Sequence, residues 1–464
     1  MDLKEVLQRI LGIAGMLLLI AFLPRLALSQ EMTVPSPLTL QQAVTIALER
    51  NPERKAALAD TKAASADVQQ ARSSLLPHVS FSETATDGTD PVYVFGSKLR
   101  QQRFTNADFG LSVLNTPGPY DNFSTRFGGT WNLFDSFSSW RAISRAERLN
   151  EARGHQLDRT EQEIIFRAVS SYYDVLLAKK QLEVAEQAMK TAQAILDRSQ
   201  DRFESGVAVQ SDFLSAQVRM STRKQELIRA QDNLALARAQ LSIAIGSSAE
   251  KEFDASDTLA ERTLPAKSLE DAEKQALEMR PDLKRIRSEE AAQVQSVAIA
   301  KSSFGPRVNA FGGWEMDNPT FVGGGGGNSW LAGLEVQIDL FEGGAKRAEL
   351  SHERALEEKV SAAKEIATDA IRLEVRRAYY GLDAARQQIE VARASIAESQ
   401  ESLRINQDRY ESGVSTITDL LAAEEVARRS DSDYWETVYR YQTDYAKLEL
   451  ASGTLNPQSP VVTP

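Results

Sequence analysis

The sequence contains no cysteine. Without cysteine the chain can form no disulfide, no thiolate metal site and no cysteine nucleophile, and it lacks the residue that carries a lipoprotein anchor. Its three histidines, His78, His155 and His352, lie far apart and show no metal-ligand spacing. We therefore expect neither a metal site nor another cofactor.

Sequence motifs for catalysis are also missing. His352 and Glu353 begin an HExxH-like motif, but Leu356 stands where the second histidine would be. The glycine run 323–327 is not followed by the Lys-Ser/Thr pair of a phosphate-binding loop, and we expect it to be a hairpin tip. We predict that the chain is not an enzyme and that any energy for transport comes from partner proteins.

Basic residues are outnumbered, with 54 Lys and Arg against 65 Asp and Glu and a formal net charge of −11. This balance argues against a nucleic-acid partner, because phosphate binding needs clustered positive charge.

Only one long apolar run is present, at 10–23, and it follows Lys4 and Arg9. Together with the small residues Ala27 and Ser29, it predicts a signal peptide over 1–29 that is removed before Gln30. An uncleaved anchor is the alternative, but 14 apolar residues are short for a helical span of about 20. The mature chain should therefore leave the cytoplasm, and any membrane insertion should use strands.

The sequence is internally duplicated. Ala43 and Pro52 recur as Ala272 and Pro281, each after 229 residues. Farther along, Leu133-Phe134-Asp135, Tyr172-Tyr173, Phe203–Val207, Asp212 and Gly246 all recur after 207 residues. The difference of 22 residues lies between Val79 and Leu133, where we expect a loop of variable length. The predicted domains are two repeats at 38–246 and 269–453, a connector at 247–268 and a tail at 454–464.

Each repeat contains segments typical of membrane strands. Trp330–Leu340 alternates between an apolar and a polar face over 11 residues, and a strand needs about 9–11 to cross a membrane. Phe123–Leu133 shows a weaker form of the pattern, and shorter strands are expected around 79–85 and 308–314. A half-buried soluble strand would also alternate. Four strands cannot close a membrane barrel, so the membrane interpretation requires several copies of the chain.

Very long helices follow the strands. Residues 140–203 contain no proline and a single glycine, Gly154, and the counterpart 346–410 is interrupted only by Gly381. In the returning helix, apolar residues recur every seven positions from Phe213 to Leu241, a repeat that favours left-handed coiled-coil packing. Narrow apolar seams fit the wall of a hollow tube, although a coiled-coil rod would show them too.

The same turn ends both long helices, as Arg202–Val207 and Arg409–Val414. Its glycine can adopt the left-handed conformation that terminates a helix, and Asp212 and Asp419 begin the returning helices, where a carboxylate is favourable. A valine at such a tip is not needed for the turn. It indicates a docking surface.

Three features occur in both repeats and in the same order: the Leu-x-x-Ala-x-x-x-Ala-Leu-x-x-x-Pro start, the Leu-Phe-Asp/Glu junction and the Gly-Val tip. With these features the sequence resembles the TolC-like outer-membrane efflux protein family over essentially the whole mature chain. The resemblance implies a mainly α protein with membrane β-strands. It implies a homotrimer in which a twelve-stranded β-barrel in outer-membrane lipid continues as a twelve-helix α-barrel in the periplasm.

By the same resemblance, Gly206, Val207, Gly413 and Val414 would contact a periplasmic adaptor protein. Tyr410 and Asp419 match positions that constrict the periplasmic entrance. Ser415 and Ala422 depart from the pattern, because the best-known member has an arginine and a second aspartate there, and the nearby Glu424 and Glu425 are possible substitutes for this charge.

The resulting hypothesis is the outer-membrane exit channel of a tripartite efflux pump, supplied by a periplasmic adaptor and an inner-membrane transporter. Two alternatives stay open at this point. One is the outer-membrane duct of type I protein secretion, and the other is a non-conducting periplasmic coiled-coil scaffold or adhesin.

Overall fold

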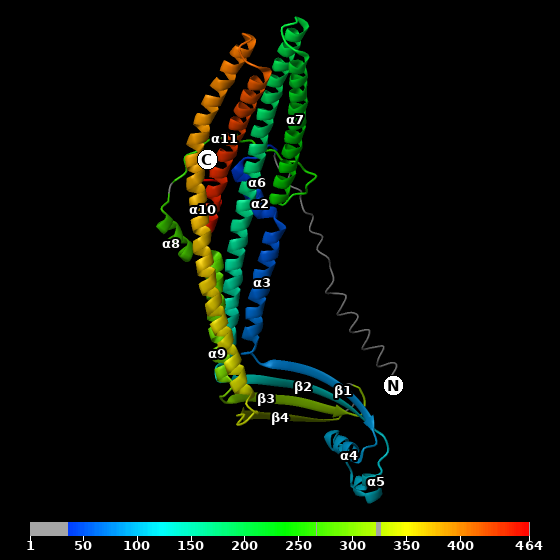
Figure 1. Cartoon of the computed structure of the whole chain (residues 1–464). Coiled ribbons are helices and arrows are strands. Elements are labelled where there is room, and N and C mark those ends of the chain that lie inside the picture. The colour runs from blue at the N-terminus through cyan, green and yellow to red at the C-terminus, as the bar shows by residue number, and fades with distance from the viewer. Residues whose placement is uncertain (1–35, 266, 322–325, 464) are drawn as a thin grey trace. The chain divides into compact units, whose positions relative to one another are not determined.

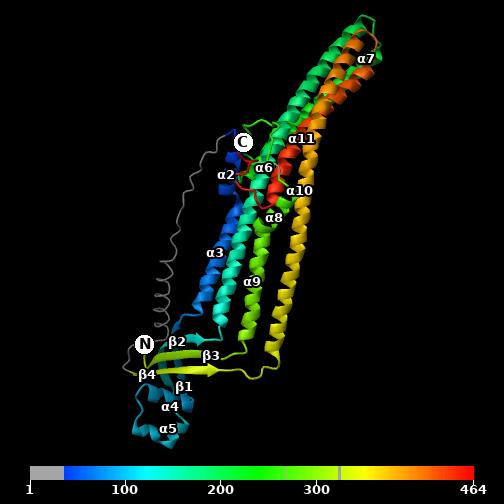
Figure 2. The same ribbon diagram turned by 90° about the vertical axis from the view of Figure 1, so that its left-hand side faces the viewer.

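The computed structural model describes residues 36–265, 267–321 and 326–463. The predicted signal peptide and most of the glycine run lie outside the described residues. The described chain divides into two compact units (Figures 1 and 2). The sheet unit consists of the described residues within Asp67–Arg145 and Val294–Arg354. The helical unit consists of 36–66 and the described residues within Ala146–Gln293 and Ala355–Pro464.

The sheet unit contains four antiparallel strands in the order β1-β2-β3-β4 (Figure 1). Strands are present at all four expected positions: β1 His78–Gly88, β2 Tyr120–Phe134, β3 Arg307–Asn318 and β4 Gly327–Gln337. The predicted strand Trp330–Leu340 is wrong at its end, because β4 stops at Gln337. That residue pairs with Arg307, the first residue of β3, so the following residues have no strand to pair with.

The strand register separates the side chains into an apolar and a polar face. Directly paired residues of an antiparallel sheet point to the same face, and successive residues alternate between faces. One row across the sheet is aromatic: Phe81, Phe127, Trp314 and Trp330. The adjacent row is polar and charged: Ser82, Arg126, Glu315 and Ser329.

The connection from β1 to β2 is folded rather than irregular. It contains α4 (Pro91–Arg100), the 3₁₀ helix η1 (Asn106–Phe109) and α5 (Leu111–Asn115). Asp90 caps α4 by accepting a hydrogen bond from the Tyr93 backbone N–H at 2.8 Å, and Pro91 occupies the first helical position, where its missing N–H is not needed. The segment predicted as a variable loop is therefore a small helical insert.

The two repeats have helices of identical length. In the order of the chain, the first repeat has α2 (Leu40–Arg50), α3 (Pro52–Ser73), α6 (Ser138–Glu204) and α7 (Gln210–Ala244), and the second has α8 (Leu269–Met279), α9 (Pro281–Ser302), α10 (Ala345–Glu411) and α11 (Ile417–Ala451). Each pair of counterparts contains 11, 22, 67 and 35 residues respectively. None of the helices in the described chain is long and apolar enough to cross a membrane.

The main core of the helical unit surrounds Tyr172, which is fully buried. Its hydroxyl donates to the carboxylate of Asp257 at 2.6 Å and also contacts the carbonyl oxygen of Leu38 at 2.9 Å. Leu38 forms a parallel bridge with Ala255. One tyrosine of α6 therefore fixes both the segment before α2 and the connector between the repeats, which explains its place in the duplicated motif of the first repeat.

Candidate functional site

The predicted docking residues lie at the two helical hairpin ends, α6–α7 and α10–α11 (Figure 2). Gly206 and Gly413 both have a φ of +72°, which is unfavourable for residues with a side chain. After each glycine the valine N–H returns to the last helical turn, from Val207 to Arg202 and from Val414 to Arg409, both at 2.9 Å. The two valines are 66% and 68% exposed, so each hairpin end presents an apolar side chain to its surroundings.

The hairpin ends of the two repeats contact each other directly. Arg202 donates from Nη1 to the carbonyl oxygen of Glu411 at 2.9 Å, and its guanidinium lies 5.1 Å from the ring centroid of Tyr410. Arg198 forms an ion pair with the carboxylate of Glu411. Both arginines belong to the last turns of α6, whereas both partners end α10. These contacts connect the two hairpin ends within one chain.

Tyr410, one of the two predicted gate residues, is only 4% exposed. It packs in an apolar cluster that joins all four helices of the two hairpins, and its hydroxyl has no hydrogen-bond partner among the described residues. The buried members of the cluster are Ile195, Ala216, Tyr410, Ile417, Leu420 and Leu421. Tyr410 therefore holds the hairpins together through its ring, by packing and by the cation–π contact with Arg202.

Asp419, the other predicted gate residue, caps α11. Its carboxylate accepts hydrogen bonds from the Thr416 hydroxyl at 2.8 Å and the Thr416 backbone N–H at 3.1 Å, and the Thr416 hydroxyl accepts one from the Asp419 backbone N–H at 3.2 Å. These hydrogen bonds lower the pKa of Asp419. The Thr-x-x-Asp spacing is the sequence signature of such a reciprocal cap, so this role of Asp419 is legible in the sequence.

A buried ionic cluster links α7 to α11 near the hairpin ends. Arg223 and Glu424 are 1% and 2% exposed and share two hydrogen bonds, of 3.0 and 2.6 Å. Arg223 also donates to Glu425 at 2.6 Å and to Glu226 at 2.7 Å. Burial opposes ionisation of Glu425, yet hydrogen bonds from Arg428 and Arg223 lower its pKa to about 2.

Sequence reasoning identified Glu424 and Glu425 as possible substitute charges but did not find their partner. The available signal was Arg223 itself, which interrupts a heptad position otherwise filled by alanine. A charged residue on a coiled-coil seam needs a buried partner, because an isolated buried charge is strongly unfavourable.

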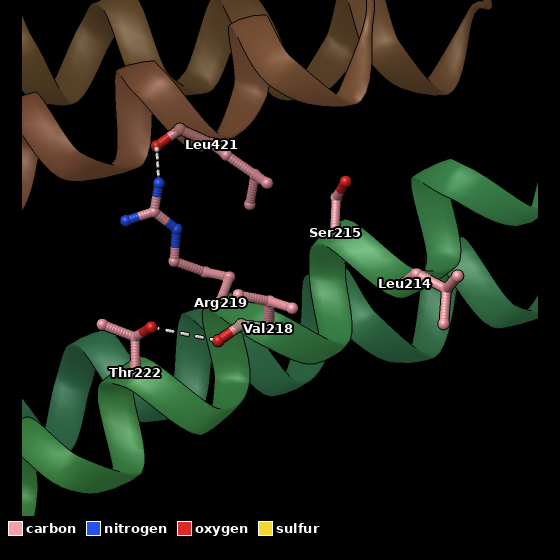
Figure 3. A pocket seen from close by; sticks show the side chains of 6 residues that line it. All are labelled: Leu214, Ser215, Val218, Arg219, Thr222 and Leu421. Carbon is pink, nitrogen blue, oxygen red and sulfur yellow. Dashed lines mark hydrogen bonds between the residues drawn. The ribbon is translucent and has the colours of Figure 1, made fainter.

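A shallow pocket lies beside this cluster, between α7 and α11 (Figure 3). Arg219 crosses it and donates a hydrogen bond from Nη2 to the carbonyl oxygen of Leu421 at 3.4 Å. The other lining residues carry no charge: Leu214, Ser215, Val218 and Thr222. Among the described residues, no group of three or more histidine, aspartate and glutamate side chains could hold a metal ion.

Two long helices each carry a stripe of exposed apolar residues that are four to fourteen positions apart in the sequence. On α7 the stripe consists of Leu214, Val218, Ile228, Leu236 and Ile243, and on α10 of Ile366, Leu373, Tyr380, Val391 and Ile405. All ten side chains are at least 40% exposed. Exposed apolar stripes of this length on a single chain indicate faces that become covered on association.

The outer membrane efflux protein family model matches residues 43–247 and 273–454, which make up most of the chain and leave a gap at the connector. The chain belongs to the outer membrane efflux protein family. Outer membrane protein TolC of Escherichia coli is 23% identical to this family member over 462 residues, covering 95% of the chain and 87% of TolC. The proteases secretion protein PrtF of Dickeya chrysanthemi is 21% identical over 427 residues, covering 90% of the chain and 89% of PrtF.

Two solved structures of bacterial membrane proteins have the same fold. The outer membrane protein VceC of Vibrio cholerae superposes with a TM-score of 0.75 at 18% identity, covering 89% of this chain and 96% of VceC. A membrane protein from Pseudomonas aeruginosa gives a TM-score of 0.79 at 20% identity, covering 92% and 98% of the two chains. The predicted family and the predicted TolC-type fold are therefore confirmed, and the outer membrane is the location of this efflux protein.

Proposed function

We propose that this outer membrane efflux protein is the exit channel of a tripartite efflux pump, and that it conducts substrates passively from a periplasmic adaptor and an inner-membrane transporter to the exterior. The observation that carries the proposal is the family match, which extends over both repeats and hence over both the strands and the long helices. The relatives bear the names of outer-membrane channels and secretion proteins.

The sheet has the two faces that a channel wall requires. Its aromatic row contains close ring pairs, with centroids 5.1 Å apart for Phe81–Phe127 and 6.1 Å for Phe127–Trp314. A row of aromatic rings at one level is typical of the membrane interface of a barrel, while the polar face suits a water-filled lumen. Because β1 and β4 have free edges within the described sheet, strands from other copies must complete the wall.

Three copies would supply twelve strands and satisfy this requirement. The exposed apolar stripes on α7 and α10 support the same assembly, because the α7 stripe of one copy can cover the α10 stripe of the next. Such a contact joins different surfaces, and it gives a closed ring when three successive rotations return to the first copy. We propose a homotrimer in which these seams close the helical tunnel.

The hairpin ends would face the periplasmic adaptor. In this proposal Val207 and Val414 provide the apolar contact, and Gly206 and Gly413 shape the turns that expose them. Tyr410 and Asp419 belong to the entrance gate, where Tyr410 acts through packing and Asp419 through the cap of α11. Ser415 and Ala422 lack the charges of the best-known family member, and the Arg223–Glu424 pair supplies a buried ionic contact close by.

The names of two relatives favour a second candidate, the outer-membrane duct of type I protein secretion. PrtF and the alkaline protease secretion protein AprF of Pseudomonas aeruginosa are 21% and 22% identical to this chain. Both candidates use the same passive channel and differ in the transporter that feeds it. To distinguish the two candidates, the inner-membrane transporter that copurifies with the chain after cross-linking in cells is identified.

The channel itself is tested in planar bilayers. We expect the protein to be recovered from the outer-membrane fraction, to cross-link as a trimer and to conduct ions. Val336→Asp, on the apolar face of β4, should prevent insertion, whereas its neighbour Gln337→Asp, on the polar face, should be tolerated. A soluble protein without conductance would instead support the coiled-coil scaffold, and equal insertion of the two variants would contradict the assigned faces.

A further inference from the structure

The polar face of the sheet contains a hollow of about 620 Å³. Gly128 of β2 pairs directly with Gly313 of β3 in this hollow. Because neither residue has a side chain, the floor of the hollow is bare backbone. The rows on either side carry larger side chains, so the space between them is open to a ligand from the polar face.

Two guanidinium groups lie on one side of the hollow. Arg126 donates to Glu315 at 2.9 Å, and Arg100 of α4 lies 3.7 Å from the other carboxylate oxygen of Glu315, which also accepts from Ser124 at 2.7 Å. Both oxygens of Glu315 are thus engaged. Each guanidinium has five N–H donors, so most donors of Arg126 and Arg100 have no protein acceptor among the described residues.

The exposure of these groups favours an anionic ligand. Arg100 and Arg126 are 63% and 61% exposed, whereas Glu315 is 17% exposed. Asp317, the next carboxylate on this face of β3, is buried, accepts a hydrogen bond from Asn122 at 2.7 Å and does not line the hollow. Apart from His78, the lining therefore carries two positive charges and one negative charge.

The other side of the hollow presents Phe311 and Leu331 as apolar groups, beside the polar side chains of His78 and Thr130. Phe311 places its ring over Gly333, where a Cβ atom would lie only 2.6 Å from the ring, and Leu331 stands beside Gly313. Thr130, the partner of Phe311, is four residues from Arg126, which corresponds to about 13 Å along the strand. The row of Gly128, Gly313 and Leu331 lies only two residues from Arg126, about 7 Å along the strand, which is within the length of a small aromatic acid.

We propose that this hollow is a contact site for aromatic carboxylates on the exit path of the channel. The carboxylate accepts hydrogen bonds from Arg126 and Arg100, and the aromatic ring packs against Phe311 and Leu331. Bidentate contacts between guanidinium and carboxylate groups give orientation as well as affinity. The inference rests on the proposed function, because the channel is what brings solutes to the polar face, and it adds a class of substrate.

The test uses 3-phenylpropionate as a probe on the reconstituted channel. We expect the probe to reduce conductance in a saturable way, and we expect propionate, which lacks the ring, and 3-phenylpropan-1-ol, which lacks the charge, to have little effect. Arg126→Gln should raise the half-inhibitory concentration at least fivefold. Arg307→Gln is the matched control, because it removes the same charge from the same face at the far end of β3.

Calorimetry on the purified protein in detergent gives a second measurement that does not depend on conductance. Saturable binding of 3-phenylpropionate that is weakened by Arg126→Gln and Phe311→Ala but not by Arg307→Gln would support the site. Conductance without any probe binding would overturn the site and leave the channel intact. Absence of conductance would contradict the proposed function, and calorimetry would then decide the site by itself.

Discussion

Arg223 of α7 and Glu424 of α11 form a buried ion pair with two hydrogen bonds, and the pair joins the first repeat to the second. Removal of one member of a buried pair leaves the other charge without compensation, which typically destabilises a protein by about 3–5 kcal/mol. We expect Glu424→Gln to fall near the lower limit, because Glu425 and Glu226 still contact Arg223. The midpoint of urea unfolding, followed by helical circular dichroism, measures the effect.

Two variants serve as controls for this prediction. Glu401→Gln removes an exposed carboxylate that pairs with Arg404 on α10 and should leave the midpoint unchanged. The double variant Arg223→Met/Glu424→Leu should recover most of the lost stability, since an apolar pair of similar volume needs no compensation. A double variant as unstable as Glu424→Gln would show that the pair is needed for more than charge balance.

The cluster also predicts a loss of stability in acid. The pKa of Glu425 is lowered from 4.5 to about 2, so its ionised form stabilises the folded state above pH 4.5. This contribution should decline as the pH falls from about 4.5 to about 2. Glu425→Gln should flatten the stability profile in that window, and an unchanged profile would contradict the assigned role of the carboxylate.

Tyr410 tests whether the proposed gate is held by packing. The ring is buried against Leu420 and Arg202, whereas the hydroxyl has no partner among the described residues. We therefore expect Tyr410→Phe to leave the resting conductance unchanged and Tyr410→Ala to raise it. An increase with Tyr410→Phe would instead show that the hydroxyl, and not only the packing of the ring, holds the gate.

Asp419 combines a proposed gate function with an observed cap, and the two can be separated. Asp419→Ala should raise resting conductance modestly. Thr416→Ala removes the hydroxyl that bonds the Asp419 backbone N–H but keeps the carboxylate, so it weakens the same cap without removing charge from the entrance. If conductance rises equally in both variants, the cap and not the charge controls the entrance.

The sequence predicted much of this architecture because the signals are local and occur twice. Helix α6 extends over Ser138–Glu204 and α10 over Ala345–Glu411, within two residues of the predicted long helices. Long helices without proline are defined by backbone hydrogen bonds between near neighbours, so their extent can be read from the sequence. Gly206 and Gly413 marked the ends of these two helices in the sequence, because helix termination at a glycine is also a local effect.

The features that sequence reasoning missed depend on contacts between distant segments. Arg223 and Glu424 are 201 residues apart, and no local pattern pairs them. The insert at α4 was expected to be a loop because ten residues make fewer than three helical turns, and so short a segment gives an ambiguous periodic signal. The hollow between Arg126 and Phe311 depends on the register of β2 against β3, which alternation within one strand does not define.

Gly453 and Gly413 provide a matched test of backbone geometry, since their φ angles are +71° and +72°. A Cβ atom at Gly453 would lie 2.8 Å from the Arg280 backbone, whereas at Gly413 the nearest atom is the end of the Arg202 side chain at 3.7 Å. Gly413→Ala should therefore lose only the left-handed preference, about 1–2 kcal/mol. Gly453→Ala should destabilise clearly more, and equal melting temperatures would contradict the close approach.

Glu449 of α11 should weaken the fold as the pH rises. Burial raises its pKa from 4.5 to about 7 despite the nearby Lys267, and one carboxylate oxygen has no hydrogen-bond partner among the described residues. The folded state favours the protonated form, so there is no penalty below pH 4.5, and a penalty of about 3 kcal/mol is complete above pH 8. Glu449→Gln should therefore raise the melting temperature at pH 8.5 and leave it unchanged at pH 4.5. A variant that melts lower than the parent at both pH values would show that the carboxylate forms a contact that the amide cannot replace.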